Sequence, residues 1–186
     1  ATYQGSACGL GGLLDSYLLP EWLPKEAALR RIESMFEGLP AVMDRRGGLA
    51  EAFPNEGSLC VTGLVAGDLL QALKWIETNL SPGKRESYLK LIEPLIHFLH
   101  CNDETHGVIS NHLATSALPL FLWTDLTGEN REKRGREIIQ KILDNQNSEG
   151  WFREYEGADP GYQTWCTSSL ARIPQIRPDL ELLGPL

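Results

Sequence analysis

The chain has 186 residues, of which 42% are hydrophobic and 23% are charged, and its formal net charge at pH 7 is −8. This composition is typical of one globular domain, and we treat residues 1–186 as a single domain. Nucleic-acid binding demands a basic surface, so the acidic balance disfavours nucleic acid and, more mildly, a highly sulfated polyanion.

Apolar spacing predicts helices separated by polar turns. Gly38 is the expected stop of the first helix, and Pro94 predicts a kink in the third. Residues 1–20 and 174–186 are expected to be irregular. The predicted helices cover residues 24–37, 58–78, 84–100, 112–124, 129–145 and 164–173.

Apolar and amphipathic helices alternate along the chain. The segments 58–78 and 112–124 are apolar on most sides, whereas 84–100 and 129–145 have one apolar face. This order is typical of an array in which inner helices pack together and outer helices cover them. Because no segment shows convincing strand alternation, we predict an all-α fold.

Three segments begin with a glycine and carry a candidate reactive side chain five residues later. They start at Gly48, Gly107 and Gly150, and a fainter copy spans Gly12 to Tyr17. Each follows a polar turn and leads into an apolar run of helical length. If the chain is a helical repeat, these equivalent loops converge at one end and build a site there.

Asn111 and His112 stand where an apolar helix is predicted to begin. Asn111 is either the N-cap of that helix or donates its amide to a substrate carboxylate while His112 transfers a proton. Tyr155 and Tyr162 flank a turn-rich loop. With Arg153 nearby to lower the pKa, a tyrosine here can act as a base; the alternative is that both rings pack with a satisfied hydroxyl.

Asn55 and Glu56 precede the first inner helix. Either Asn55 or Ser58 caps that helix, with Glu56 favourable at its start, or the polar groups face the mouth of the shared cavity. Three nearby aromatic residues can form a platform for a sugar ring, and two of them are expected in the core: Trp151, Phe152 and Trp165.

All four histidines fall between residues 97 and 112, together with Cys101 and Asp103. His97 and His100 have a spacing that can chelate on a helix, but no recognised ligand frame surrounds them. Capping and surface histidines explain the cluster, so no metal is expected. The sequence also has no motif that indicates a cofactor.

The cysteines are spread singly and form no CxxC pair. A disulfide scaffold or zinc ribbon is therefore disfavoured. Cys60 and Cys166 lie in apolar helical runs and are expected to behave as small hydrophobic residues. No uncharged apolar run approaches the ~20 residues of a membrane span, and no signal peptide is recognised, so no membrane is expected and the compartment is left open.

Two segments resemble heparinase II/III-like proteins. Residues 48–58, GLAEAFPNEGS, resemble the family's Gly-Ser-Phe-x-Glu-x-Tyr-Pro-Asn-Glu-x-Ser segment. Residues 149–164, EGWFREYEGADPGYQT, are similar to its Gly-Trp-Phe-x-Glu-Tyr-x-Gly-x-Asp-Pro-Gly-Tyr segment. With the Asn-His step these segments span roughly residues 45 to 173. The match to the Gln-Trp motif of triterpene cyclases at residues 146–151 is looser, and the Asp-rich motifs of those enzymes do not occur.

The resemblance implies an incomplete α/α-toroid of about three helix pairs and cleavage of uronate polysaccharides by β-elimination. Asn111 and His112 match the family's Asn-His step, Tyr162 matches its catalytic-tyrosine segment, and Tyr155 falls where related lyases often place a histidine. The family's β-sandwich is missing, and Phe53 replaces a tyrosine. Such a short toroid is a fragment, half of a homodimer that completes its wall, or a protein that has left lyase chemistry.

The sequence therefore predicts a lyase-like protein that acts on a uronate-containing saccharide. The alternatives are a non-catalytic toroid that binds an acidic or neutral saccharide or a partner protein, and another small-molecule enzyme on the same scaffold. The predicted catalytic residues are Asn111, His112, Tyr162 and Tyr155, and the predicted substrate-binding residues are Asn55, Glu56, Arg153, Glu154, Trp151 and Trp165.

Overall fold

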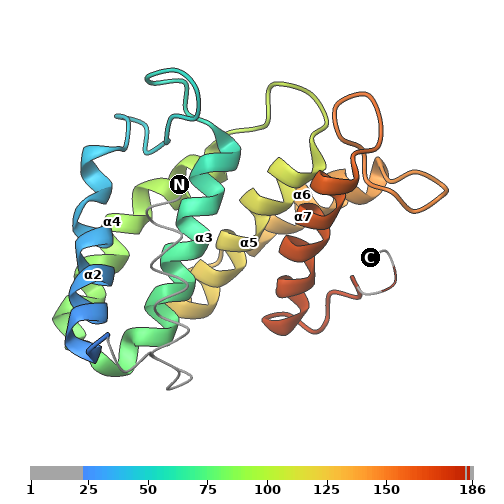
Figure 1. Cartoon of the computed structure of the whole chain (residues 1–186). Helices are drawn as coiled ribbons and strands as arrows, with labels where there is room; N and C mark the ends of the chain where they lie inside the picture. Colours follow the sequence, from blue (N-terminus) through green and yellow to red (C-terminus); the bar gives the residue numbers. More distant parts are fainter. Residues whose placement is uncertain (1–22, 183, 185–186) are drawn as a thin grey trace.

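The computed structural model describes residues 23–182 and 184, and in this part of the chain every regular element is a helix (Figure 1). The all-α prediction is confirmed. Short 3-10 helices follow three of the α-helices. The elements are α2 (Lys25–Glu37), η1 (Leu39–Ala41), α3 (Leu59–Ile76), η2 (Glu77–Asn79), α4 (Pro82–Cys101), α5 (Ser110–Thr127), α6 (Glu132–Asp144), α7 (Pro160–Arg172) and η3 (Ile173–Gln175).

Helices α4 and α7 begin earlier than predicted because a capping residue and a proline set the first turn of each. Ser81 precedes Pro82, and its side chain accepts a hydrogen bond from the backbone of α4. Asp159 precedes Pro160, and its carboxylate accepts from the backbone N–H of Tyr162, so α7 includes residues that the sequence assigned to a loop. Proline at the first helical position after a short polar cap is a favourable start. The helix α4 continues through Pro94.

Helix α5 lies at the centre of the array and packs against α3, α4, α6 and α7. It is longer than the predicted 112–124, and from Ser110 to Trp123 only His112 escapes full burial. Figure 1 shows α3, α5 and α7 running in the same direction, so that the loops leading into them lie on one side of the molecule. The first residues of the three helices therefore face the same end.

Small residues set the close approach of the helices. A Cβ atom on Gly63 of α3 would lie 2.7 Å from the backbone oxygen of Thr115 on α5, and one on Gly135 of α6 would lie 2.6 Å from the Phe121 ring. Neither space admits a methyl group without displacement, so these glycines let α3 and α6 pack tightly on α5.

The segment Leu59–Asn79 is long and apolar enough to cross a membrane, with a mean hydropathy of 1.4, which the sequence prediction did not anticipate. In its most apolar window 67% of the residues are buried inside the protein. A buried core helix meets the same criteria, so this one segment is weak evidence for a span.

The predicted irregular C-terminal segment has no α-helix after Arg172 in its described part, where η3 is followed by turns and bends. The predicted irregular residues 1–20, the Gly12 copy of the repeat and Cys8 lie outside the described residues.

Candidate functional site

The three glycine-started loops meet at the end of the array where α3, α5 and α7 begin. Ile109 and Glu154 form an isolated antiparallel bridge that joins the second loop to the third. Ser110 strengthens this junction, because its backbone N–H and its hydroxyl both donate to the Arg153 carbonyl, at 3.1 and 2.7 Å. The first loop closes on itself where the Ser58 N–H donates to the Leu49 carbonyl. The predicted convergence of the loops is confirmed.

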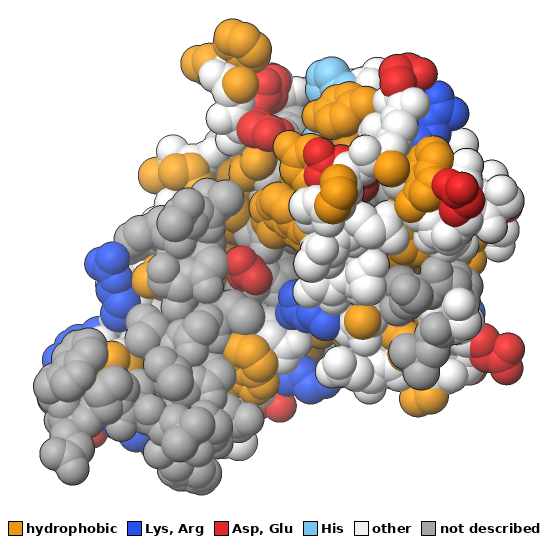
Figure 2. Space-filling view, turned by 45° about the vertical axis from the view of Figure 1, so that its right-hand side comes forward, with side chains coloured by type: hydrophobic (Ala, Val, Ile, Leu, Met, Phe, Trp, Pro, Cys, Tyr) orange, Lys and Arg blue, Asp and Glu red, His pale blue; other side chains and the backbone are white. Residues whose placement is uncertain are grey.

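A cavity of about 390 Å³ lies where these loops meet, and we call it the loop-end cavity. Its walls are rich in acidic residues and also contain two histidines and one tyrosine. Figure 2 shows a histidine side chain on this rim of the molecule, next to hydrophobic and acidic side chains. The lining residues are Glu51, Ala52, Phe53, Glu56, Gly57, Ser58, Leu59, Asp103, Glu104, Thr105, His106, Ile109, His112 and Tyr155.

Glu104 and His112 form a partly buried ion pair in this cavity. The Glu104 Oε2 lies 2.7 Å from the His112 Nδ1, and Oε1 lies 2.8 Å from the Nδ1 of the exposed His106. Burial by itself raises the pKa of Glu104, but the hydrogen bonds from His112 and His106 outweigh it and lower that pKa to about 2.

His112 carries a positive charge at neutral pH. Burial by itself lowers its pKa, but hydrogen bonds and electrostatic interactions with Cys60 and Glu104 raise it to about 10. The ring stands on the third residue of α5, where the positive end of the helix dipole disfavours a cation. The buried carboxylate of Glu104 offsets that cost, so His112 is a fixed cation, poorly suited to remove a proton at neutral pH.

Tyr155 shares the loop-end cavity with His112. Its backbone φ is +53°, in the left-handed region that a bulky residue rarely adopts, and its side chain is 51% exposed. The turn that forces this conformation is closed by two hydrogen bonds between Glu154 and Gly157. The phenol ring of Tyr155 is thus both exposed and part of the cavity wall.

The prediction that Arg153 lowers the pKa of the neighbouring tyrosine is wrong for Tyr155. Partial burial and the negative charges of groups around it, among them Tyr162 and Glu51, raise the pKa of Tyr155. The Arg153 guanidinium is directed elsewhere, since its Nε donates to the Tyr155 backbone carbonyl and its Nη2 lies 3.5 Å from the Glu156 carboxylate. Tyr155 is therefore a neutral phenol at neutral pH.

Asn111 is neither an N-cap nor open to a substrate. The helix α5 begins at Ser110, and Asn111 is 1% exposed. Its backbone N–H and side-chain Nδ2 donate to the two oxygens of the buried Glu154 carboxylate, at 2.8 and 2.7 Å. Glu154 thus caps α5 from another loop, and neither its carboxylate nor the Asn111 Nδ2 remains free for a ligand. Burial raises the pKa of Glu154 in spite of these hydrogen bonds.

The two predicted polar residues of the first loop, Asn55 and Glu56, line different hollows. The Glu56 carboxylate lines the loop-end cavity but is held by backbone N–H groups of its own loop, including that of Ala52 at 2.7 Å. Those hydrogen bonds lower its pKa. Ser58, not Asn55, caps α3. Asn55 lines a different hollow beside Arg46, so the prediction that it faces the shared cavity is wrong.

The three predicted aromatic residues differ in burial. Phe152 is fully buried, whereas Trp151 is half-buried and Trp165 is exposed on α7, so only one of the three lies in the core and not two. Tyr162 is exposed in the first turn of α7 and is not among the lining residues of the loop-end cavity. The tyrosine that shares a cavity with His112 is thus Tyr155.

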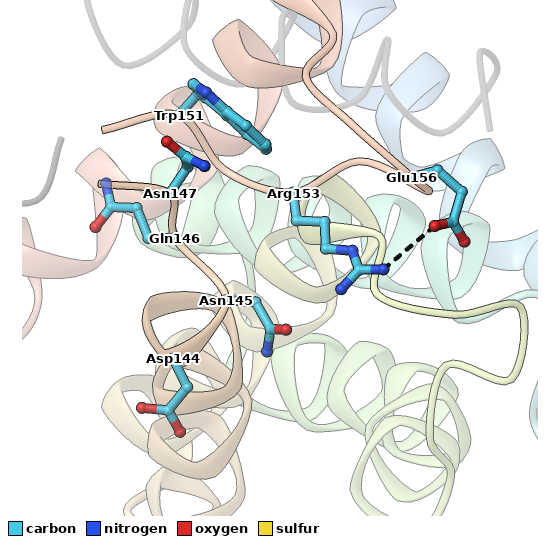
Figure 3. Close-up of a pocket in the computed structure, with 7 residues that line it drawn as sticks. All are labelled: Asp144, Asn145, Gln146, Asn147, Trp151, Arg153 and Glu156. Carbon is cyan, nitrogen blue, oxygen red and sulfur yellow. Dashed lines mark hydrogen bonds and ion pairs between the residues drawn. The ribbon is translucent and has the colours of Figure 1, made fainter. Parts of the chain in front are cut away.

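Two further hollows continue the loop-end cavity along the rim. The middle hollow, of about 490 Å³, shares His106 and Tyr155 with the cavity and is lined on its far side by Arg153 and Glu156. Arg153 and Glu156 also line the third, the amide hollow, of about 300 Å³. In Figure 3, Trp151 and the amide side chains of the hollow lie opposite the Arg153–Glu156 ion pair. Each hollow shares lining residues with the next, and we call the three together the loop-end depression.

Among the described residues, no group of three histidine, cysteine or acidic side chains is arranged to hold a metal ion. His106 and His112 are both engaged by Glu104, and His97 lies on α4 beside Cys101, with 3.8 Å between its Nε2 and the sulfur. The described cysteines are all free thiols.

Comparison of the chain with known protein families, with curated proteins and with solved structures finds no match. The resemblance to heparinase II/III-like proteins therefore stays a prediction.

The sequence did not single out Glu104, and it treated Cys60 only as a small hydrophobic residue. Cys60 is buried as expected, but it is also among the groups that raise the pKa of His112. Two sequence signals point to them. Cys60 follows the Ser58 cap by two residues, so it belongs to the first turn of α3, and Glu104 is an acidic residue in the loop between two histidines. Only the fold brings both to His112.

Proposed function

We propose that the chain binds a uronate-containing saccharide in the depression along its loop end and cleaves it by β-elimination, on a scaffold of the incomplete α/α-toroid kind. The observation that carries the proposal is the loop-end cavity, where the cation His112 and the exposed phenol of Tyr155 line the same space. A cation beside the carboxylate and a phenol at the reacting carbon are the groups that this elimination requires.

In the proposed reaction His112 neutralises the substrate carboxylate and so acidifies the proton on the adjacent carbon. Tyr155 in its phenolate form removes that proton, the C–O bond to the next sugar breaks, and Tyr155 returns the proton to the leaving oxygen. This assigns His112 to charge neutralisation, a role that Asn111 was predicted to fill, because the Asn111 amide is occupied by Glu154.

The adjoining hollows favour a chain of sugar units over a single one. The amide hollow offers the Trp151 ring, side-chain amides and the Arg153 guanidinium, which suit the apolar face, hydroxyls and carboxylate of a sugar unit. The acidic residues that line the loop-end cavity repel a polyanion of high charge density. We therefore favour an oligosaccharide in which uronate alternates with neutral sugars.

The test is the ultraviolet absorbance of the unsaturated uronate product during incubation with glucuronan, alginate and mixed uronate oligosaccharides. Because the phenolate of Tyr155 is scarce at neutral pH, the rate should rise about tenfold per pH unit. It should fall again near pH 10, where His112 loses its charge. Tyr155→Phe should abolish turnover and Tyr162→Phe should not. If no unsaturated uronate forms from any substrate of the panel between pH 7 and pH 10, the lyase proposal is refuted.

A binding role without turnover is the second candidate. It is favoured because Asn111 donates two hydrogen bonds to the Glu154 carboxylate. Here the depression binds the oligosaccharide but lacks an amide that neutralises the carboxylate. Quenching of Trp151 fluorescence by oligosaccharide without product, lost in Arg153→Ala but kept in Tyr155→Phe, would support this role. An unchanged spectrum at millimolar ligand would exclude it.

A further inference from the structure

A lysine that the sequence did not single out lines the middle hollow. Lys141 stands in the last turn of α6, and its partly buried side chain borders the hollow together with Arg153 and Tyr155. Within the described part of the chain its ammonium group forms no hydrogen bond and no ion pair, whereas Lys74 on α3 pairs with a carboxylate at 2.7 Å. The charge of Lys141 is therefore available to a ligand in the hollow.

Arg153 brings a second cation to the same hollow, from the loop between α6 and α7. Its Nε donates to the Tyr155 carbonyl at 3.1 Å, and its Nη2 lies 3.5 Å from the Glu156 carboxylate (Figure 3). The Glu156 side chain is 96% exposed, and so long a contact with a solvated carboxylate contributes little. An incoming carboxylate can therefore bind this guanidinium beside Glu156 or in its place.

The other acidic residues near the middle hollow do not cancel these two charges. Glu104 also lines the hollow, but one of its oxygens is held by the cation His112. Arg134 binds the Asp103 carboxylate and is the main cause of its lowered pKa, to which the more distant charge of Lys141 adds. Two cations thus face one exposed carboxylate, and this part of the loop-end depression attracts an anion.

The loop-end cavity has the opposite balance of charge. Glu51 and Glu56 line this cavity but not the middle hollow, and the charge of His112 is already opposed by that of Glu104. The sign of the charge therefore changes along the loop-end depression, from acidic at the loop-end cavity to basic at the far side of the middle hollow. A ligand that spans both gains most when it carries a carboxylate at the basic side.

The middle hollow has the size and the donors for a sugar unit that carries a carboxylate. Its volume of about 490 Å³ is within the range of small-molecule sites. The ammonium of Lys141 is a point charge and the guanidinium of Arg153 is a planar fork, and both bind carboxylates through charge-assisted hydrogen bonds. A carboxylate is also the anionic group that the proposed substrate carries.

We propose that Lys141 and Arg153 bind a second carboxylate of the saccharide, on a unit that is not cleaved, and so select oligosaccharides that contain at least two uronate units. This inference rests on the proposed function, because the ligand is the same oligosaccharide. The reacting uronate occupies the loop-end cavity, and the second carboxylate lies at the far side of the middle hollow, next to the amide hollow. Lys141 is thus a residue for specificity and not for catalysis.

The test measures binding by isothermal titration calorimetry in the Tyr155→Phe variant, so that turnover does not disturb the titration. The probes are a trisaccharide with a uronate at each end and a neutral sugar between them, and its two derivatives in which one or the other carboxyl group is reduced to an alcohol. The parent trisaccharide should bind about tenfold tighter than at least one derivative, because a charge-assisted contact is lost in that derivative.

Adding Lys141→Ala should lower this affinity ratio about threefold or more, and Lys141→Arg should largely keep it. Lys133→Ala is the matched control, because Lys133 is an exposed lysine in the first turn of the same helix and lines none of the three hollows. The control should leave the ratio unchanged. Circular dichroism checks that each variant is folded.

An unchanged ratio in Lys141→Ala, an equal loss in Lys133→Ala, or no binding of the trisaccharide at millimolar concentration would overturn the inference. Failure of the elimination gives a different result: the trisaccharide binds with a ratio that depends on Lys141, but the wild-type chain releases no unsaturated uronate. Release of that product together with a ratio independent of Lys141 would leave the elimination standing and remove Lys141 from its role.

Discussion

The replacement Glu104→Gln keeps the shape of the side chain and removes the charge that holds His112. A fall in the pKa of Glu104 from 4.5 to about 2 corresponds to roughly 3 kcal/mol of stabilisation of the folded protein, at about 1.36 kcal/mol per pH unit. The raised pKa of His112 reports the same ion pair and is not added. Because the His112 ring would keep its charge beside a neutral amide, we expect a loss of ~3 kcal/mol in the free energy of unfolding.

The pH dependence of this loss follows from the two pKa changes. The contribution of Glu104 is present above its ordinary pKa of 4.5 and is lost as the pH falls toward 2. The contribution of His112 is fully present below 6.5 and is lost as the pH rises through about 10. Both contributions are fully present between pH 4.5 and pH 6.5. The difference in the free energy of unfolding between wild type and variant should therefore be largest in that range and should decrease at lower and at higher pH.

Urea denaturation followed by circular dichroism at about pH 5.5 and above about pH 10 measures the difference. His106→Gln is the matched control, because His106 contacts the same carboxylate but its side chain is 77% exposed, so its loss should cost less than about 1 kcal/mol. A loss below about 1 kcal/mol for Glu104→Gln at pH 5.5, or an equal loss at both pH values, would refute the ion-pair reasoning.

Two further predictions concern stability. Gly63→Ala should lower the free energy of unfolding by about 1–3 kcal/mol, because its Cβ would meet the backbone of α5. A Cβ on Gly67 of the same helix would meet no atom of the described residues within 4 Å, so Gly67→Ala should raise the free energy of unfolding by up to ~1 kcal/mol in thermal or urea denaturation. Glu154→Ala should cost about 2–3 kcal/mol, since α5 loses its cap and the Asn111 amide loses its acceptor. Glu156→Ala, on the exposed part of the same turn, should change stability by less than about 0.5 kcal/mol, and equal losses in the two variants would contradict the capping role.

The sequence by itself determined the all-α class, the approximate position of the six described helices and the convergence of the loops. Hydrophobic spacing is a local property, and each apolar run of helical length could bury its face only against its neighbours. The starts of α4 and α7 were also present in the sequence, as Ser81-Pro82 and Asp159-Pro160, although hydrophobic spacing alone placed them a few residues late.

The roles of single polar residues were decided only by the tertiary structure. Asn111 has the local features of a cap or a ligand-binding amide, but a carboxylate 43 residues away in the sequence, that of Glu154, takes both of its donors. Likewise, Glu104 belongs to a loop and His112 to α5, and no motif in the sequence relates them. They meet because the loop that precedes α5 returns to the first turn of that helix, where burial strengthens the interaction between their charges.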